Sequence, residues 1–138
     1  MKFEDFKNTL LYRKITKWED NQITLDNGIE ISIEMTDSDC CAYAYGQFKD
    51  VVLDAAITNV SDIEYEPWKD EDGWGEYGCK ATVTIMHNRN VICKAVGEAD
   101  AGNGGYYYSI ASFVVRILGN EDKEYCHFVG SEDGEEDD

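Results

Sequence analysis

Residues 22–35 constrain the fold more than any other segment, because their alternation predicts a β-hairpin with a loop of defined length. An Asn-Gly pair that ends at Gly28 marks the turn. A two-residue turn would place Leu25 opposite Glu30 and so mix apolar and acidic side chains on one face. A three-residue loop places Leu25 opposite Ile29 and keeps that face apolar. The pattern therefore predicts a three-residue loop with a left-handed Gly28 and a β-bulge.

Much of the remaining chain shows the same two-residue period or short β-branched runs. A second hairpin is expected around a three-residue loop at 88–90, with apolar residues sharing one face. After a glycine-rich turn at 102–105, a nearly continuous apolar and aromatic run predicts a central strand that is buried on both faces. The expected strands span residues 11–18, 51–53, 57–65, 79–95 (as a hairpin), 106–118 and 125–129.

Two segments predict helix. Phe3, Phe6 and Leu10 recur at helical spacing, which predicts a short amphipathic N-terminal helix. Residues 36–39 offer helix caps before residues 40–45, which predicts one or two helical turns or a structured loop. The expected fold class is α+β: a mostly antiparallel twisted sheet of hairpins with a short N-terminal helix and one further short helix.

The chain has the length of one domain, since 138 residues suffice for one core and not for two. No linker divides the sequence. We therefore expect a single α+β domain over residues 1–130, followed by an acidic C-terminal tail over residues 131–138.

Charge is the unusual property of this chain, with 29 acidic against 12 basic side chains and a formal net charge of -17. Six of the acidic residues lie in the tail, which leaves -11 on the rest. Such a surface repels nucleic acid and anionic membranes, and it attracts basic surfaces at long range. The alternative is that the charge serves only solubility, although a net charge of about 2–8 in magnitude is enough for a small domain.

The N-terminal sequence and the cysteines indicate the cellular compartment of the protein. Acidic residues interrupt the apolar stretch at the N-terminus, unlike in a secretory signal peptide, and no window approaches the ~20 apolar residues that span a bilayer. Five cysteines at irregular spacing argue against a secreted disulfide framework. These features predict a cytoplasmic protein.

The cysteines and histidines also suggest a metal site. Cys40 and Cys41 are adjacent, and His87 and Cys93 are expected on one face of the second hairpin. Thiolates and imidazoles are the usual ligands of a structural Zn²⁺ ion, so these four residues are the predicted metal ligands. No C-x-x-C or H-x₃-H spacing accompanies them, and the alternative is that these cysteines are small buried hydrophobic residues. The dipeptide at 126–127 is a weaker candidate of the same kind.

No pattern of residues predicts catalysis. Neither of the two histidines has a recognisable catalytic setting, and the carboxylates are too numerous for an acid–base pair to be singled out. The glycine-rich turn at 102–105 precedes a strand, so it lacks the helix N-terminus with which such loops bind phosphate. We expect no enzymatic activity.

Acidic and aromatic residues crowd together at 66–78, a segment that also contains the only proline and is expected to form a surface loop. Carboxylates attract and orient Arg and Lys, while rigid rings provide anchor contacts and cation–π partners. The alternative is that the tryptophans fold back onto the core. The predicted partner-binding residues are Glu66, Trp68, Asp70, Glu71, Asp72, Trp74, Glu76 and Tyr77.

Three short motifs carry a resemblance to a family. They are LDNG at 25–28, DCCAYA at 39–44, and AGNGGYY at 101–107, before a β-rich run. They resemble small uncharacterised proteins of phages and bacteria that carry a similar DCCAYA segment and a glycine-tyrosine turn. The resemblance covers most of residues 11–118. It implies a phage origin and a coherent fold, and no reaction.

In size and charge the chain is also similar to anti-CRISPR inhibitors of type II systems, many of which look like nucleic-acid mimics. An RNA-guided nuclease holds nucleic acid in positively charged channels, which a folded surface of carboxylates can occupy. The resulting hypothesis is a phage-encoded inhibitor, acting in the cytoplasm of the infected bacterial host, that binds the type II CRISPR nuclease and blocks target DNA binding. Alternatives are a general DNA mimic against another host DNA-binding protein, a metal-dependent phage enzyme, and a virion or accessory structural protein.

Overall fold

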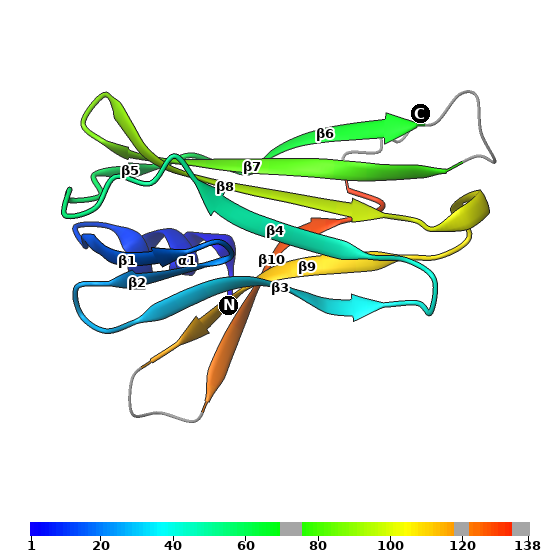
Figure 1. Ribbon diagram of the computed structural model, residues 1–138, viewed down its shortest axis with the longest axis horizontal. Helices are drawn as coiled ribbons and strands as arrows, with labels where there is room; N and C mark the ends of the chain where they lie inside the picture. The colour runs from blue at the N-terminus through cyan, green and yellow to red at the C-terminus, as the bar shows by residue number, and fades with distance from the viewer. Residues whose placement is uncertain (70–75, 118–121, 134–138) are drawn as a thin grey trace.

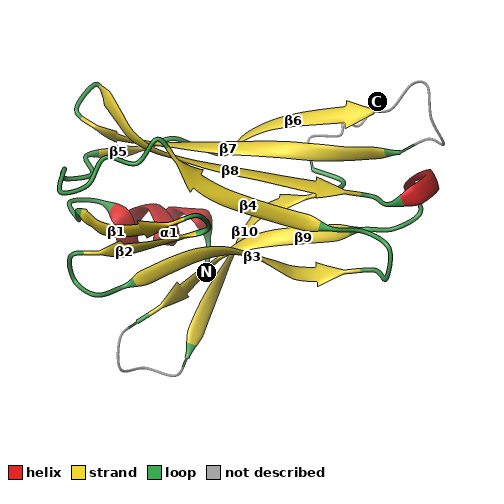
Figure 2. Ribbon diagram, in the orientation of Figure 1, coloured by secondary structure: helices red, strands yellow, loops and turns green. Residues whose placement is uncertain are grey.

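The computed structural model describes residues 1–69, 76–117 and 122–133, and its strands form two antiparallel sheets that lie one over the other (Figures 1 and 2). The first sheet has the strand order β1-β2-β3-β9-β10. Its strands are β1 (Ile15–Glu19), β2 (Gln22–Leu25), β3 (Glu30–Ser38), β9 (Ser109–Arg116) and β10 (Lys123–Gly130).

The second sheet has the order β4-β8-β7-β5, and β6 also pairs with β7. Its strands are β4 (Ala44–Lys49), β5 (Asn59–Val60), β6 (Glu64–Lys69), β7 (Tyr77–His87) and β8 (Asn90–Asp100). The long β7–β8 hairpin forms the centre of this sheet. β4 is hydrogen-bonded to β8 on one side of the hairpin, and β6 is hydrogen-bonded to β7 on the other. Two stacked antiparallel sheets with a shared core make the fold a β-sandwich.

The predicted α+β class is wrong, because the described residues are mostly strand and contain a single α-helix. That helix, α1 (Phe3–Leu10), is at the predicted N-terminal position. The second predicted helix is absent from residues 40–45. β3 instead runs on to Ser38 by pairing with β9, so the expected capping residues are used in a strand, and β4 begins at Ala44. A 3₁₀ turn, η1 (Asn103–Gly105), occupies the glycine-rich turn.

The first predicted hairpin is confirmed. The Leu25 amide donates to the Ile29 carbonyl at 2.8 Å, and Ile23 pairs with Ile31. Gly28 has a φ of 88°, the left-handed conformation that a three-residue loop requires. The requirement that one face of the hairpin stay apolar therefore predicts its register correctly.

The second hairpin forms, but its turn is shorter than predicted. His87 pairs with Asn90 across a two-residue turn. A bulge between Ile85 and Met86 then restores the expected pairing of Ile85 with Cys93. The bulge shifts the register by one residue, so the apolar face is kept although the loop length was wrong.

Among the other predicted strands, β9 lies between β3 and β10 and is buried on both faces, as expected. The strand predicted at 125–129 also forms, as β10, and it pairs with β9. Residues 51–53 do not form a strand, and the 57–65 segment divides into β5 and the start of β6.

The core between the sheets is centred on Phe113 of β9. Its ring stacks on Phe6 of α1 at a centroid distance of 4.2 Å and on Phe128 of β10 at 4.4 Å. Phe48 of β4 approaches from the opposite sheet at 6.4 Å. Each fully buried phenylalanine stabilises the fold by about 1.5–3 kcal/mol. The helix therefore contributes to the core rather than lying outside it.

No helix in the described ranges is long and apolar enough to cross a bilayer.

Candidate functional site

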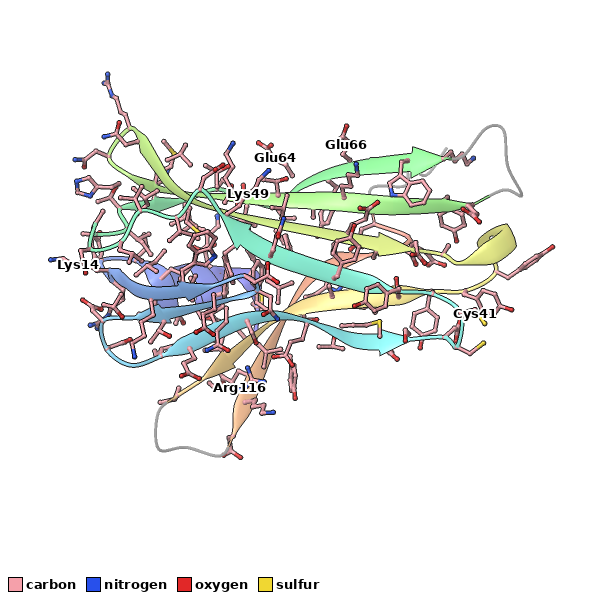
Figure 3. All side chains as sticks on the ribbon, viewed as in Figure 1. Lys14, Cys41, Lys49, Glu64, Glu66 and Arg116 are labelled. Carbon is pink, nitrogen blue, oxygen red and sulfur yellow. The ribbon has the colours of Figure 1, made fainter. Side chains whose placement is uncertain are left out.

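Four of the eight predicted partner-binding residues lie in the described part of the chain. Glu66 and Trp68 are on β6, Tyr77 begins β7 and Glu76 precedes it. Both ends of the predicted surface loop at 66–78 are therefore strand. In Figure 3 the Glu66 side chain points outward from the second sheet. The other four, Asp70, Glu71, Asp72 and Trp74, lie outside the described residues.

Trp68 lies flat on the sheet instead of projecting into solvent. It pairs in register with Gly78, and a Cβ at Gly78 would lie only 2.6 Å from the Trp68 ring. Its indole nitrogen is buried and has no hydrogen-bond partner within the described structure. For Trp68, the alternative prediction is therefore the correct one: the ring packs back onto the folded domain.

Two loops that are far apart in the sequence meet at the same end of the sandwich as Trp68. One is the β3–β4 connection and the other joins β8 to β9 through η1. Backbone hydrogen bonds join them, since Asp39 N donates to Tyr108 O at 2.9 Å and Asp100 N donates to Tyr43 O at 3.0 Å. The Asp100 carboxylate also accepts from the amides of Tyr43 and Gly102, each at 3.1 Å. The two loops therefore form one surface.

This surface gathers tyrosines and carboxylates, and we call it the tyrosine–acid end. Tyr43 and Tyr45 are about half exposed, at 58% and 51%, with ring centroids 5.9 Å apart, and Tyr106 is 86% exposed. The Tyr45 hydroxyl donates to Glu98 at 2.8 Å. The tyrosine–acid end comprises Asp37, Asp39, Tyr43, Tyr45, Glu98, Asp100, Tyr106, Tyr107 and Tyr108.

Hydrogen bonds to neighbouring side chains raise the pKa of three of these phenols. The hydrogen bond to Glu98 raises the pKa of Tyr45, and a hydrogen bond to Asp37 raises the pKa of Tyr108. A hydrogen bond to Cys41 raises the pKa of Tyr107. The surface therefore presents neutral aromatic rings beside carboxylates, which is a suitable chemistry for a guanidinium or ammonium group.

A small pocket connects the tyrosine–acid end with the predicted loop. It has a volume of about 180 Å³ and is lined by Cys41, Trp68, Glu76, Asp100 and Gly102. Gly102 has a φ of 69°, and a Cβ there would lie 2.6 Å from the Cys41 carbonyl oxygen. Only glycine fits this close approach with that backbone conformation.

A larger groove runs along β4 from the tyrosine–acid end. Its volume is about 820 Å³, and its lining combines acidic, polar and apolar groups. Glu34 in this lining accepts from Arg116 at 2.8 Å. Burial acts to raise the pKa of Glu34, but the hydrogen bonds from Ser32 and Arg116 outweigh it and lower that pKa overall. The lining residues are Asp20, Asn21, Ile33, Glu34, Met35, Tyr43, Ala44, Tyr45, Gly46 and Gln47.

The four predicted zinc ligands are not brought together. Cys40 and Cys41 are exposed at the tyrosine–acid end, whereas Cys93 is buried in β8. His87 contacts the Ala56 carbonyl oxygen at 2.7 Å. Ala56 is bridged to Lys14, which Figure 3 labels at the end of the molecule opposite to Cys41.

Within residues 1–69, 76–117 and 122–133, no three His, Cys, Asp or Glu side chains are grouped so that they could hold a metal ion. The zinc site stays a prediction from the sequence, without support from this geometry.

The weaker pair at 126–127 divides between two environments, as expected for neighbours on a strand. Cys126 is buried, which raises the pKa of its thiol to about 11. His127 is exposed and contacts Asp133 at 2.6 Å. Asp133 also accepts from Gly130 N at 2.6 Å, and Ser131 is buried. Residues 131–133, the start of the predicted tail, therefore pack on the sandwich.

Sequence reasoning missed the tyrosine–acid end as a site. Its two loops are the DCCAYA segment and the glycine-tyrosine turn, and no sequence pattern assigns their tyrosines to a binding site. Tyr43 and Tyr45 alternate with buried alanines, and this period of two is the signal that both rings lie on an exposed face. Nothing in the sequence pattern shows that two segments about sixty residues apart are in contact.

Comparison with known families places both loops in one domain. Residues 8–114 match a domain of unknown function, DUF7448. The chain belongs to this family. The matched range includes the DCCAYA segment and the glycine-tyrosine turn, but the family description links neither of them to a function or to anti-CRISPR proteins. No curated protein and no solved structure gives a significant match.

Proposed function

We propose that this DUF7448 protein is a non-catalytic inhibitor that binds a basic surface of a nucleic-acid-handling host protein through its tyrosine–acid end. The first candidate partner is the type II CRISPR RNA-guided nuclease, and the protein would be encoded by a phage and act in the infected host. The observation that carries the proposal is the convergence of five tyrosines and four carboxylates on one end of the folded body.

The chemistry of that end complements arginine. A guanidinium group pairs with carboxylates in a bidentate manner and stacks on aromatic faces. Tyr43 and Tyr45 provide two neighbouring exposed rings. Glu98 pairs in register with Tyr45, and the Asp100 carboxylate accepts from the Tyr43 amide. Tyrosine also loses little conformational entropy on binding, because it has only two rotatable side-chain bonds. The surface therefore combines anchor contacts with charge.

Long-range charge adds to this local chemistry. A net charge of -17 accelerates association with a basic partner, and the effect weakens as salt screens it. Two lysines on the neighbouring strands oppose this charge: Lys80 lies in register between Glu66 and Glu98, and Lys69 pairs with Tyr77. The carboxylates of the tyrosine–acid end outnumber these two lysines, so the potential at this end is negative.

The groove along β4 offers a concave site next to the exposed rings. Its volume of about 820 Å³ is in the range of ligand-binding clefts, and Tyr43 and Tyr45 form part of its wall. Asp20 contributes a carboxylate to its lining, and so does Glu34, whose charge is paired with Arg116. A basic loop of the partner would enter this groove while its arginines contact the tyrosines.

Competition with target DNA tests the proposal. The purified protein is mixed with the guide-loaded type II nuclease at moderate salt, and the binding of target DNA is measured. The proposal predicts inhibition that weakens at least about tenfold, or about 1.4 kcal/mol, in the double variant Tyr43→Ala/Glu98→Gln.

The matched control is Glu124→Gln/Tyr125→Ala on β10, which makes the same change in charge and ring number away from the tyrosine–acid end. It should inhibit like the wild type. Equal weakening in both double variants would show that charge acts without a defined site. Absence of binding and inhibition would refute this partner. Competition with duplex DNA for guide-free proteins would instead favour the general DNA mimic.

A further inference from the structure

The five cysteines of the chain fall into two classes. Cys40 and Cys41 are exposed, and the other three are buried. Burial raises the pKa of Cys93 to about 12 and that of Cys79 to about 11. Because the thiolate is the reactive form, the buried cysteines are inert in the folded protein. Any thiol chemistry of the native chain is therefore confined to the adjacent pair.

The backbone turn brings the two exposed sulfurs together. Neighbouring side chains on a strand point to opposite faces, but these two residues lie in a turn closed by a hydrogen bond from Ala42 N to Asp39 O at 3.4 Å. The two Sγ atoms are 2.7 Å apart. Hydrogen bonds between Asp39 and Tyr108 and the close contact of Cys41 with Gly102 fix the turn. The proximity of the thiols is thus built into the fold.

We propose that Cys40 and Cys41 form a thiol–disulfide exchange site that closes reversibly to a disulfide between these adjacent residues. The oxidant is a low-molecular-weight disulfide such as oxidised glutathione. In the first step one cysteine thiolate attacks a sulfur of the oxidant, forming a mixed disulfide and releasing one thiol. In the second step the other cysteine attacks the protein sulfur of the mixed disulfide and releases the second thiol. The two protons of the cysteines leave on the released thiols.

The geometry of the pair serves both steps. Cys40 and Cys41 are both exposed, so either sulfur is accessible to a small disulfide. Because the two Sγ atoms are 2.7 Å apart, the second cysteine is within reach of the mixed disulfide and acts as the resolving thiol.

The closed form should be easy to reduce. The Cα atoms of adjacent residues are about 3.8 Å apart across a trans peptide, below the ~4.4–6.8 Å usual for disulfides. Strained and exposed disulfides have the more oxidising potentials and belong to the labile class. The pair is therefore suited to reversible closure and not to a permanent structural crosslink.

Closure would alter the tyrosine–acid end. Tyr107 hydrogen-bonds to Cys41, and Cys41 lines the pocket shared with Trp68 and Asp100. Forming the disulfide removes the thiol from both sets of contacts. The exchange site itself does not depend on the proposed partner and can be tested without one.

Thiol counting on the purified full-length protein provides the test. A thiol-specific reagent should react rapidly with two cysteines in the folded protein and with all five after unfolding. After exposure to oxidised glutathione, the fast-reacting thiols should fall from two to none, while three remain on unfolding without reductant. The intact mass should decrease by two hydrogen atoms, and peptide mapping should place the link at 40–41.

The single variants Cys40→Ser and Cys41→Ser are the matched controls. Each should keep one fast thiol and accumulate a stable glutathione adduct, because no resolving thiol remains. The proposal is overturned if the wild type keeps both thiols, gains a glutathione adduct that persists, or forms a disulfide-linked dimer. None of these results bears on partner binding, so this proposal and the proposed function fail independently.

Discussion

In the half of the sandwich that carries α1, the space between the sheets is filled by apolar side chains, whereas at the tyrosine–acid end the sheets are bridged by hydrogen bonds. Phe6 of the helix stacks on Phe113 in the first half. At the other end, the Ser109 hydroxyl of β9 lies 2.7 Å from the carbonyl oxygen of Asp100, the last residue of β8, and 3.0 Å from that of Tyr43, which precedes β4, so these two acceptors share its one proton. The apolar half supplies most of the stability, and the polar end holds exposed rings and carboxylates in fixed positions.

The largest expected effect is at the centre of the apolar half. Replacing Phe113 by Ala removes a ring that stacks on both Phe6 and Phe128, and it leaves a cavity. We expect a loss of about 3–5 kcal/mol in the free energy of unfolding, measured by chemical denaturation. A loss below about 1 kcal/mol would mean that this ring cluster does not hold the sheets together.

The next largest effect tests the contact between the two loops of the tyrosine–acid end. Gly102→Ala places a Cβ about 2.6 Å from the Cys41 carbonyl oxygen at a φ of 69°. We expect the free energy of unfolding to fall by about 1–3 kcal/mol. Gly104→Ala, at a φ of 74° and a ψ of 3°, is the control for a positive φ without the ψ of -171° found at Gly102. If the two variants were equally stable, the close packing of the loops would be refuted.

A smaller effect is expected at the Asp133 contact with His127. Burial acts to raise the pKa of Asp133, but hydrogen bonds from His127 and Gly130 N outweigh it and lower that pKa below its ordinary value of 3.8. We expect Asp133→Asn to reduce the free energy of unfolding by about 1 kcal/mol at pH 7.

The pH dependence of that difference has a defined sign. The carboxylate stabilises the fold at pH values above about 4, and this contribution is lost as the pH falls through the lowered pKa. Denaturation of the wild type and the variant between pH 7 and pH 2 should therefore show curves that converge at low pH. A difference that grows on acidification would contradict the assigned contacts.

The smallest effect on stability is expected at the most exposed ring. Tyr106 is 86% exposed, so Tyr106→Ala should change the free energy of unfolding by no more than about 0.5 kcal/mol. A larger loss in thermal or chemical denaturation would mean that the tyrosine–acid end supports the core, which would remove the distinction between the two halves.

The sequence predicts best where one local pattern decides the structure. The apolar face of residues 22–35 determined the first hairpin, and the spacing of Phe3, Phe6 and Leu10 determined α1. The helix predicted after residues 36–39 is wrong because residues that cap helices are also compatible with a strand. The long-range pairing of β3 with β9 favours the strand over the helix.

The candidate site was less predictable than the fold. The composition of the acidic aromatic segment predicts exposed anchor rings, yet Trp68 lies flat over Gly78. The tyrosine–acid end depends on contacts between Asp39 and Tyr108 and between Tyr43 and Asp100, which link distant segments. Such contacts follow from the stacking of the two sheets, and a single sequence contains no local signal for them.

The most direct test of the tyrosine–acid end as the binding site is the affinity of the guide-loaded type II nuclease for three proteins, measured side by side at moderate salt: the wild type, Tyr43→Ala/Glu98→Gln and Glu124→Gln/Tyr125→Ala. We expect tight binding by the wild type and the β10 variant, and at least about tenfold weaker binding by the variant of the tyrosine–acid end. Binding that is the same for all three proteins would contradict the assignment of the site.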